Sequence, residues 1–100
     1  MKNVLLPMQT RMLKQVGEQI KFARLRRNIT SEEMAMRTSL GRNTIVKIEA
    51  GSESVSMGNY FRVLIALGLD RDILHLAKDD ILGRKLQDAG LHIRKRATSE

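Results

Sequence analysis

Residues 29–51 read ITSEEMAMRTSLGRNTIVKIEAG, and this stretch decides the fold. Thr30 and Glu33 have the spacing of a capping box, in which each side chain accepts a hydrogen bond from the other residue's backbone N–H. The helix that follows has its buried-side residues at spacings of one and four, which is typical of one face of a short helix. These residues are Met34, Ala35 and Thr38.

A second helix is predicted from Arg42 to Ala50, after a break at 39–41. Ile45 and Ile48 are expected to face inward, and Gly51 is suited to stop the helix just past its end. A polar and cationic set falls on the other side, near the helix start, which is what insertion into a DNA major groove requires. This set is Arg42, Asn43, Thr44 and Lys47.

The stretch resembles the helix-turn-helix of the lambda-repressor-like family, of the Xre or Cro/C1 type. The family pattern begins apolar, Ser/Thr and ends Ile-x-x-Ile-Glu-x-Gly, and the resemblance covers residues 13–77. The matching positions are Ile29, Thr30, Glu33, Met34, Ala35, Ile45, Ile48, Glu49 and Gly51. The chain departs at Ser39, where the family usually has Gly, and at Gly41, where it usually has Ser or Thr. The resemblance implies an all-α, five-helix DNA-binding domain with a short helical or extended C-terminal appendage.

Composition points to the same fold class independently. One hundred residues are enough for one small domain with one core. Hydrophobic residues make up 42% and aromatic residues 3%, and there is one Pro and no Asn-Gly hairpin signal, so an all-α fold is favoured. The absence of Cys suits a reducing compartment. No apolar run is long enough for a membrane span or a secretory signal, so a cytoplasmic location is expected.

The positive charge is concentrated in the half that contains the proposed DNA reader. Residues 1–51 carry ten Lys or Arg and four Glu, a net charge of +6, whereas residues 52–100 carry a net charge of +1. Such an excess is expected where a surface meets phosphates. A generic solubilising charge is the alternative, and charge alone does not decide between them.

The chain divides into four parts. Residues 1–10 are expected to be a flexible arm, 11–77 the helix-turn-helix domain, 78–93 an extension for dimer or partner contact, and 94–100 a disordered basic tail. Helix 1 is predicted from Thr10 to Arg27, and its apolar face is composed of Leu13, Val16, Ile20, Phe22 and Ala23.

The later helices are marked by capping residues. Ser56 caps a predicted central buried helix over 57–67, and Asp70 is expected to cap a short helix over 71–77. Residues 78–90 are expected to contain a sixth short helix. The alternation in 91–94 allows a short strand or an extended segment.

Each candidate DNA-reading residue has an alternative role. Arg42 and Lys47 suit guanine or a phosphate, and Asn43 suits adenine or helps to cap its helix. Thr44 suits a thymine methyl group or a phosphate. Val46 either edges into the core or contacts a thymine methyl group.

The resemblance also implies phosphate contacts and one internal bond. The phosphate candidates are Arg24, Arg27, Ser31, Ser52 and Ser54. The alternative for the two arginines is a solvated charge that opposes the helix dipole, and for the two loop serines an ordinary linker. By resemblance, Glu49 bonds back inside the domain to an arginine of helix 1.

The predicted function is that of a sequence-specific transcriptional repressor, which binds an inverted-repeat operator as a homodimer. The predicted dimer surface is composed of Ile73, Leu74, Leu82, Leu86, Leu91 and Ile93. Residues 55–64 and the Gly-Arg-Lys-Leu-Gln-Asp segment at 83–88 resemble HipB-type antitoxins encoded beside HipA-like kinases. That resemblance implies an autoregulated toxin–antitoxin operon and a kinase partner.

Two other functions are compatible with the sequence. One is a protein-interaction module that restrains a HipA-like kinase, with DNA binding secondary. The other is nucleic-acid binding by charge alone, which would fall steeply with salt. An enzyme, a cofactor and a metal site are not expected, because His75 and His92 lie far apart in sequence and no activated nucleophile or phosphate-binding loop is present.

Overall fold

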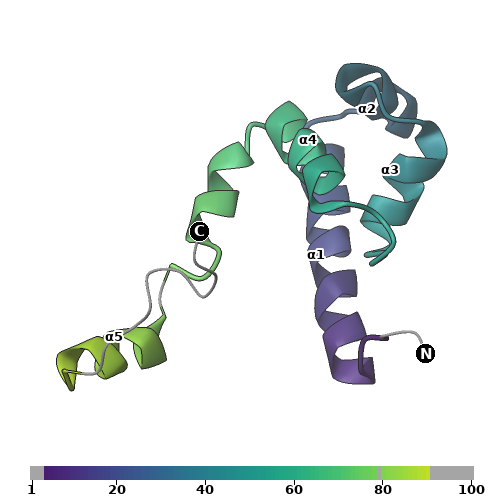
Figure 1. Ribbon diagram of the computed structural model, residues 1–100. Coiled ribbons are helices and arrows are strands. Elements are labelled where there is room, and N and C mark those ends of the chain that lie inside the picture. Colours follow the sequence, from purple (N-terminus) through teal and green to yellow (C-terminus); the bar gives the residue numbers. More distant parts are fainter. Residues whose placement is uncertain (1–3, 79, 91–100) are drawn as a thin grey trace, which may run out of the picture.

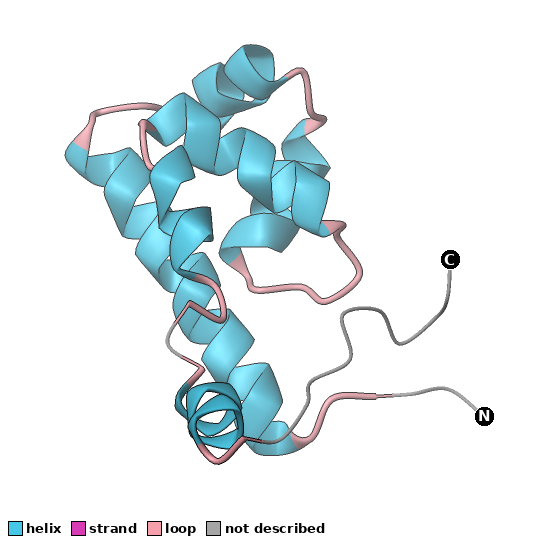
Figure 2. Ribbon diagram, turned by 60° about the vertical axis from the view of Figure 1, so that its left-hand side comes forward, coloured by secondary structure: helices cyan, strands magenta, loops and turns pink. Residues whose placement is uncertain are grey.

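The computed structural model describes residues 4–78 and 80–90, and every regular element in these ranges is a helix (Figures 1 and 2). The prediction of an all-α fold is confirmed. No helix in the described ranges is long and apolar enough to cross a membrane. The elements are α1 (Pro7–Arg26), α2 (Ser31–Thr38), α3 (Arg42–Glu49), α4 (Met57–Leu67), the 3₁₀ helix η1 (Asp70–His75) and α5 (Ile81–Asp88).

The first helix begins three residues earlier than the sequence predicted, at Pro7 instead of Thr10. Proline suits the first helical position, because its φ is fixed and the N–H that it lacks would have no partner inside the helix. The Gln9 side chain accepts a hydrogen bond from the backbone N–H of Leu6 at 2.9 Å. The last four residues of the expected arm are therefore helical.

The two helices of the central stretch form as predicted. The Glu33 N–H donates to the Thr30 hydroxyl at 3.0 Å, and the Thr30 N–H donates to the Glu33 carboxylate at 2.8 Å, so the capping box is present. Ser39 ends α2 in the left-handed conformation, with φ of 58°, at the position where the family pattern has Gly. Gly41 precedes α3 without a side-chain cap.

The hydrophobic core lies where α1, α2, α3 and α4 meet. Met34 of α2 and the predicted inward residues Ile45 and Ile48 of α3 have no exposed surface. The bounds predicted for α4 are confirmed, and its Ser56 cap accepts from the Asn59 N–H at 3.2 Å. The buried hydrophobic residues are Ile20, Ala23, Ile29, Met34, Ile45, Ile48, Val63 and Leu67.

The buried face of α1 is narrower than the sequence predicted. Ile20 and Ala23 are buried, but Val16 and Phe22 are 42% and 49% exposed, so the expectation that these two lie in the core is wrong. Phe22 follows Ile20 by two positions, which turns its side chain roughly 200° around the helix.

Two glycines allow α1 to cross closely over the end of α3. A Cβ atom on Gly17 would lie 2.6 Å from both the Gly51 nitrogen and the Ile48 carbonyl oxygen. Gly51 has φ of +72°, and a Cβ atom there would lie 2.5 Å from the Leu13 carbonyl oxygen. The backbones of α1 and of the α3 end are therefore in direct contact. Sequence reasoning found the helix stop at Gly51 but missed Gly17.

The segment after α4 differs from the prediction. The expected helix over 71–77 is the 3₁₀ helix η1, and Asp70 is its first residue, not its cap. The chain enters η1 from Leu69 without a side-chain hydrogen bond. It leaves through Leu76 in an extended conformation and Ala77 in the left-handed one, so the turn cannot continue as an α-helix.

The predicted sixth helix is present as α5. The Asp80 carboxylate caps it by accepting from the Gly83 N–H at 2.9 Å. Figure 1 shows η1 and α5 extending from α4, on the side away from α2 and α3. The extended segment expected over 91–94 and the tail expected over 94–100 lie outside the described residues.

Candidate nucleic-acid interface

The outer side of α3 carries the residues that the sequence predicted to read bases. With Ile45 and Ile48 in the core, the opposite side of this helix faces solvent. Val46 is 56% exposed, so the alternative that it packs into the core is wrong. Thr44 is half-buried at the edge of the surface, and the exposed polar residues are Arg42, Asn43 and Lys47.

A buried ion pair fixes α3 to α1. The Arg24 Nε donates to Glu49 Oε2 at 2.6 Å, and Arg24 Nη2 donates to Glu49 Oε1 at 3.0 Å. A third bond runs from Arg24 Nη1 to the Ile29 carbonyl oxygen at 2.8 Å. The two side chains are only 7% and 10% exposed. The pair therefore joins the end of the reading helix, the end of α1 and the entry to α2. The expectation that Glu49 bonds to an arginine of helix 1 is confirmed.

The same geometry corrects the expected role of Arg24. Its guanidinium is turned inward and bonded to Glu49 and Ile29, so it is not available for a DNA phosphate, nor is it the solvated charge of the alternative. The hydrogen bond from Glu49 raises the pKa of Arg24, against the opposing effect of burial, and the Glu49 charge adds to the rise. Arg24 is thus held charged within the fold.

A hollow of about 490 Å³ lies between the end of α1 and the starts of α2 and α3. Ser31 and Arg42, predicted separately as phosphate and base contacts, both line it. The first turn of α2 provides backbone N–H groups there, and helix N-termini favour anions. Glu32 also lines the hollow and opposes an anion.

Asn28 is a lining residue that the sequence reasoning missed. It is exposed, and its φ of 55° puts it in the left-handed region directly after α1. Asn at the end of a predicted helix is the signal that was available, because it tolerates this conformation better than most residues. Arg27 is exposed and donates through Nη1 to the Ala23 carbonyl oxygen at 2.8 Å. Arg27 is not among the residues that line the hollow.

The loop after α3 holds its two candidate serines together. The Ser52 and Ser54 hydroxyl oxygens are 2.7 Å apart, and the Ser54 N–H donates to the Ser52 hydroxyl at 3.1 Å. The Tyr60 hydroxyl of α4 donates to the Ser52 carbonyl oxygen at 2.6 Å. Tyr60 is half-buried, and this burial raises its pKa. The loop is therefore tied to α4, and of the two serines Ser54 is exposed while Ser52 is half-buried.

The residues predicted for a dimer surface divide between two elements. Ile73 is half-buried and Leu74 exposed on η1, whereas Leu82 and Leu86 are exposed on α5. Leu91 and Ile93 lie outside the described residues. Within the described ranges, no group of three or more His, Cys, Asp or Glu residues could hold a metal ion.

Comparison with known families places the chain among helix-turn-helix proteins. A family model described as a helix-turn-helix domain matches residues 17–80, which cover the second half of α1 and all of α2, α3, α4 and η1, and end just before α5. No curated protein gives a significant match.

Proposed function

The chain belongs to the helix-turn-helix domain family, which indicates a DNA-binding regulator, and we propose that it is a sequence-specific transcriptional repressor. The observation that carries the proposal is the two-sided α3, with Ile45 and Ile48 fully buried and a polar, cationic side exposed. A helix of this kind, held on a rigid support, can enter the major groove with its outer side against the base edges.

The chemistry of the outer side supports base recognition. Arg42 and Lys47 can donate to guanine O6 and N7, and Asn43 can pair with adenine N6 and N7. Val46 and the Thr44 methyl group suit the thymine methyl group. These five side chains offer three types of base contact within one helix and so can distinguish a short sequence, whereas binding by charge alone would require no such arrangement.

Phosphate contacts would set the register of α3 in the groove. Ser31 at the α2 start and Ser54 in the loop after α3 carry hydroxyl groups that can donate to phosphate oxygens. Arg27, at the end of α1, has N–H groups beyond the one bonded to Ala23. Arg24 acts indirectly, since it holds Glu49 and hence the end of α3.

One α3 reads only a few base pairs, so we propose that two copies bind an inverted repeat. Helix-turn-helix dimers of this kind contact half-sites about one helical turn, roughly 34 Å, apart. The exposed apolar residues of η1 and α5 are the proposed source of the dimer contact, because they lie away from α3 (Figure 1).

The test begins with selection of the bound DNA from a random duplex pool, followed by titration at fixed salt. We expect Arg42→Ala and Lys47→Ala each to weaken binding by about 1–3 kcal/mol, that is, roughly 5- to 150-fold. Arg71→Ala is the charge-matched control, because Arg71 is exposed on η1. Equal losses in all three variants, or a selected pool without a shared sequence, would contradict base reading by α3.

A second candidate function is that of an antitoxin in a HipBA-like operon. The resemblance of residues 55–64 and 83–88 suggests it, and α5 lies beyond the residues that the family model matches. In this form the chain represses its own operon and also binds a HipA-like kinase. Kinase binding is either its main role, with DNA binding secondary, or a role in addition to repression. Co-expression with the product of the adjacent gene tests it. If removal of residues 78–100 abolishes co-purification but leaves DNA binding, the partner surface is separate. If no kinase co-purifies with the full chain, the antitoxin role is excluded for that pair.

A further inference from the structure

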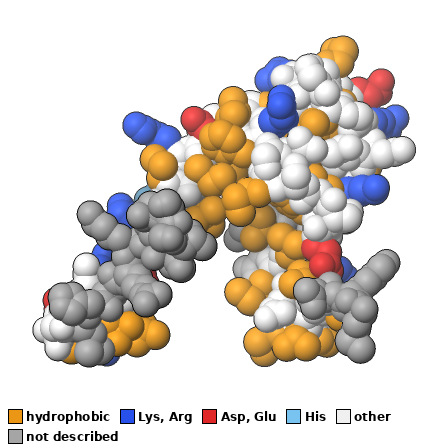
Figure 3. All heavy atoms as spheres, in the orientation of Figure 1, with side chains coloured by type: hydrophobic (Ala, Val, Ile, Leu, Met, Phe, Trp, Pro, Cys, Tyr) orange, Lys and Arg blue, Asp and Glu red, His pale blue; other side chains and the backbone are white. Residues whose placement is uncertain are grey.

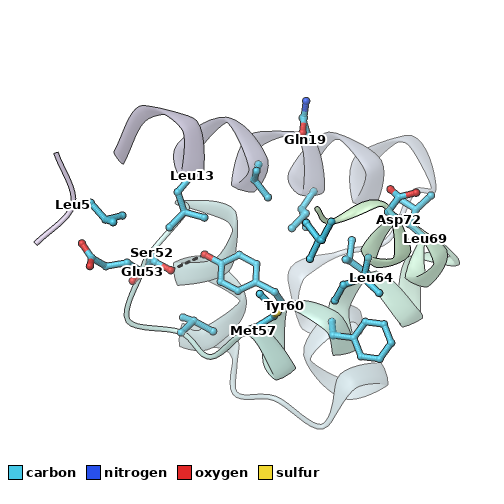
Figure 4. A pocket seen from close by; sticks show the side chains of 16 residues that line it. Leu5, Leu13, Gln19, Ser52, Glu53, Met57, Tyr60, Leu64, Leu69 and Asp72 are labelled. Carbon is cyan, nitrogen blue, oxygen red and sulfur yellow. Dashed lines mark hydrogen bonds between the residues drawn. The ribbon is translucent and has the colours of Figure 1, made fainter. Parts of the chain in front are cut away.

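An apolar groove of about 620 Å³ runs between α1 on one side and α4 with η1 on the other (Figure 4). Figure 4 shows Leu5 and Leu13 near one end and Leu69 near the other. Val16, which the sequence assigned to the core, lines this groove and is 42% exposed. Because apolar side chains are accessible along its length, the groove is suited to receive another apolar surface.

The helix α5 has such a surface, and it makes no extensive contact with the other described helices. Its apolar residues are Ile81, Leu82 and Leu86, which gather on one side of the helix together with Ala89, directly after its end. Ile81 and Leu82 are 62% and 68% exposed, and none of the eight residues of α5 is buried. Figure 3 shows hydrophobic side chains on α5 and, separately, on α4 and the start of α1.

The charges of the two surfaces differ in sign, since α5 carries the two cations Arg84 and Lys85 and the one anion Asp88, a net charge of +1. The charged residues that line the groove are Glu53 and Asp72, both acidic, in a chain whose net charge is +7. Figure 4 shows them at opposite ends of the groove. Lys85 lies on α5 between Leu82 and Leu86 in sequence, and it is exposed. A helix docked through its apolar side would therefore bring a cation to an acidic rim.

The connection between η1 and α5 favours a groove on another copy. Leu76 lines the groove of its own chain, and only residues 77–80 separate it from α5. Four residues span about 14 Å at most when fully extended. Because η1 is itself a wall of the groove, its own α5 would have to turn back across that wall within this length. A second copy is not limited in this way.

We infer that α5 of each copy docks in the groove between α1 and α4 of a second copy, so that two chains exchange their C-terminal helices. The contact is isologous, because the same groove and the same helix are used twice around a two-fold axis. This inference deepens the proposed function by assigning both surfaces of the dimer. It is tested without DNA, so its failure would leave base reading by α3 unaffected.

The most direct test uses introduced cysteines, since the full chain has none of its own. Val16→Cys in the groove and Leu82→Cys on α5 are combined in one chain and oxidised mildly. We expect a covalent dimer. A disulfide within one chain would overturn the inference by showing that α5 docks on its own groove, and the absence of any disulfide would overturn it as well.

Two controls separate docking from random collision. Leu82→Cys alone, and Leu82→Cys combined with Met36→Cys on the exposed part of α2, are oxidised in the same way. Docking predicts at least about tenfold less covalent dimer in both controls than in the protein that combines Val16→Cys with Leu82→Cys. Equal yields in all three proteins would overturn the inference.

Sedimentation equilibrium of uncrosslinked protein gives an independent measure. We expect Leu86→Glu to raise the dimer dissociation constant more than about tenfold, because its carboxylate would be desolvated in an apolar groove. Lys85→Glu and Asp72→Lys should each raise the dimer dissociation constant about two- to fivefold, and the double variant should return it to the parent value. Met36→Glu is the control, and circular dichroism checks each fold. An unchanged dimer dissociation constant in Leu86→Glu would contradict the exchange of α5 between two copies.

Discussion

The part of the chain from α1 to α4 and the part from η1 to α5 use apolar residues in opposite ways. In the first part Met34, Ile45 and Ile48 are fully buried, whereas in the second Leu74 and Leu82 are about two-thirds exposed. The first part also contains the Arg24–Glu49 ion pair, which joins α1 to α3. The difference indicates that the first part has a packed core of its own, whereas no described residue of the second part is buried.

Removal of one partner of the buried ion pair should have the largest effect on the first part of the chain. Glu49→Ala would leave the Arg24 charge enclosed without its carboxylate, and such a loss costs about 3–5 kcal/mol. Urea unfolding followed by circular dichroism measures it. Glu18→Ala, which removes an exposed acidic residue from α1, should change the free energy of unfolding by less than about 0.5 kcal/mol. Similar small effects in both would mean that the pair does not hold α3.

Truncation of one apolar residue from each part tests the contrast in packing. Met34→Ala should lower the free energy of unfolding by about 2–5 kcal/mol, because it opens a cavity in the core. Leu82→Ala should cost less than about 0.5 kcal/mol when the protein is dilute enough to be monomeric. Thermal unfolding at low concentration measures both. A large loss from Leu82→Ala under these conditions would show that α5 packs on its own chain.

The close crossing of α1 over α3 predicts opposite signs for two Gly→Ala changes. Gly17→Ala should destabilise by about 1–3 kcal/mol, since its Cβ would meet the backbone of Ile48 and Gly51. Gly58→Ala on α4 has only the Ser56 hydroxyl nearby, at 3.8 Å, and should stabilise by up to about 1 kcal/mol through helix propensity. The denaturant midpoints of the two variants, compared with that of the parent protein, measure both changes. Stabilisation by both changes would contradict the crossing.

The smallest expected effect is a pH dependence from the capping box. Hydrogen bonds from the Thr30 backbone and hydroxyl lower the pKa of Glu33 below its ordinary value of 4.5. The ionised carboxylate therefore stabilises the fold above this pH, and the contribution is lost as the pH falls through the lowered pKa. Glu33→Gln keeps the acceptor but not the titration, so its thermal midpoint should vary less between about pH 5 and 3. Parallel curves for the two proteins would exclude this role.

Much of the helix-turn-helix was predictable because its signals are local. The Thr30 and Glu33 spacing, the Ser56 cap and the inward pair Ile45 and Ile48 each depend on neighbours within one or two turns. The contact of Glu49 with an arginine came from family resemblance instead. Which arginine it contacts was not settled by sequence, because three arginines follow closely in 24–27.

The features that were missed depend on partners distant in sequence. Arg24 follows Gly17 and Ile20 at spacings of seven and four, so it shares the buried side of α1. An arginine on that side is predicted to be buried only when the carboxylate that pairs with it is known, and here that carboxylate belongs to Glu49. Gly17 matters because Gly51 passes against it, thirty-four positions later. The choice between α and 3₁₀ geometry after Asp70 likewise depends on how the chain leaves η1.

The central claim is that the exposed side of α3 reads base edges, and base-analogue substitution tests it most directly. Affinities of the parent protein and Arg42→Ala are measured for the selected site and for a site with single guanines replaced by 7-deazaguanine, which lacks the N7 acceptor. At the guanine read by Arg42, we predict that the analogue weakens DNA binding by the parent protein by about 1 kcal/mol or more. It should leave DNA binding by Arg42→Ala unchanged. If every guanine replacement weakens both proteins equally, Arg42 does not contact a guanine N7, and this reading of α3 is wrong.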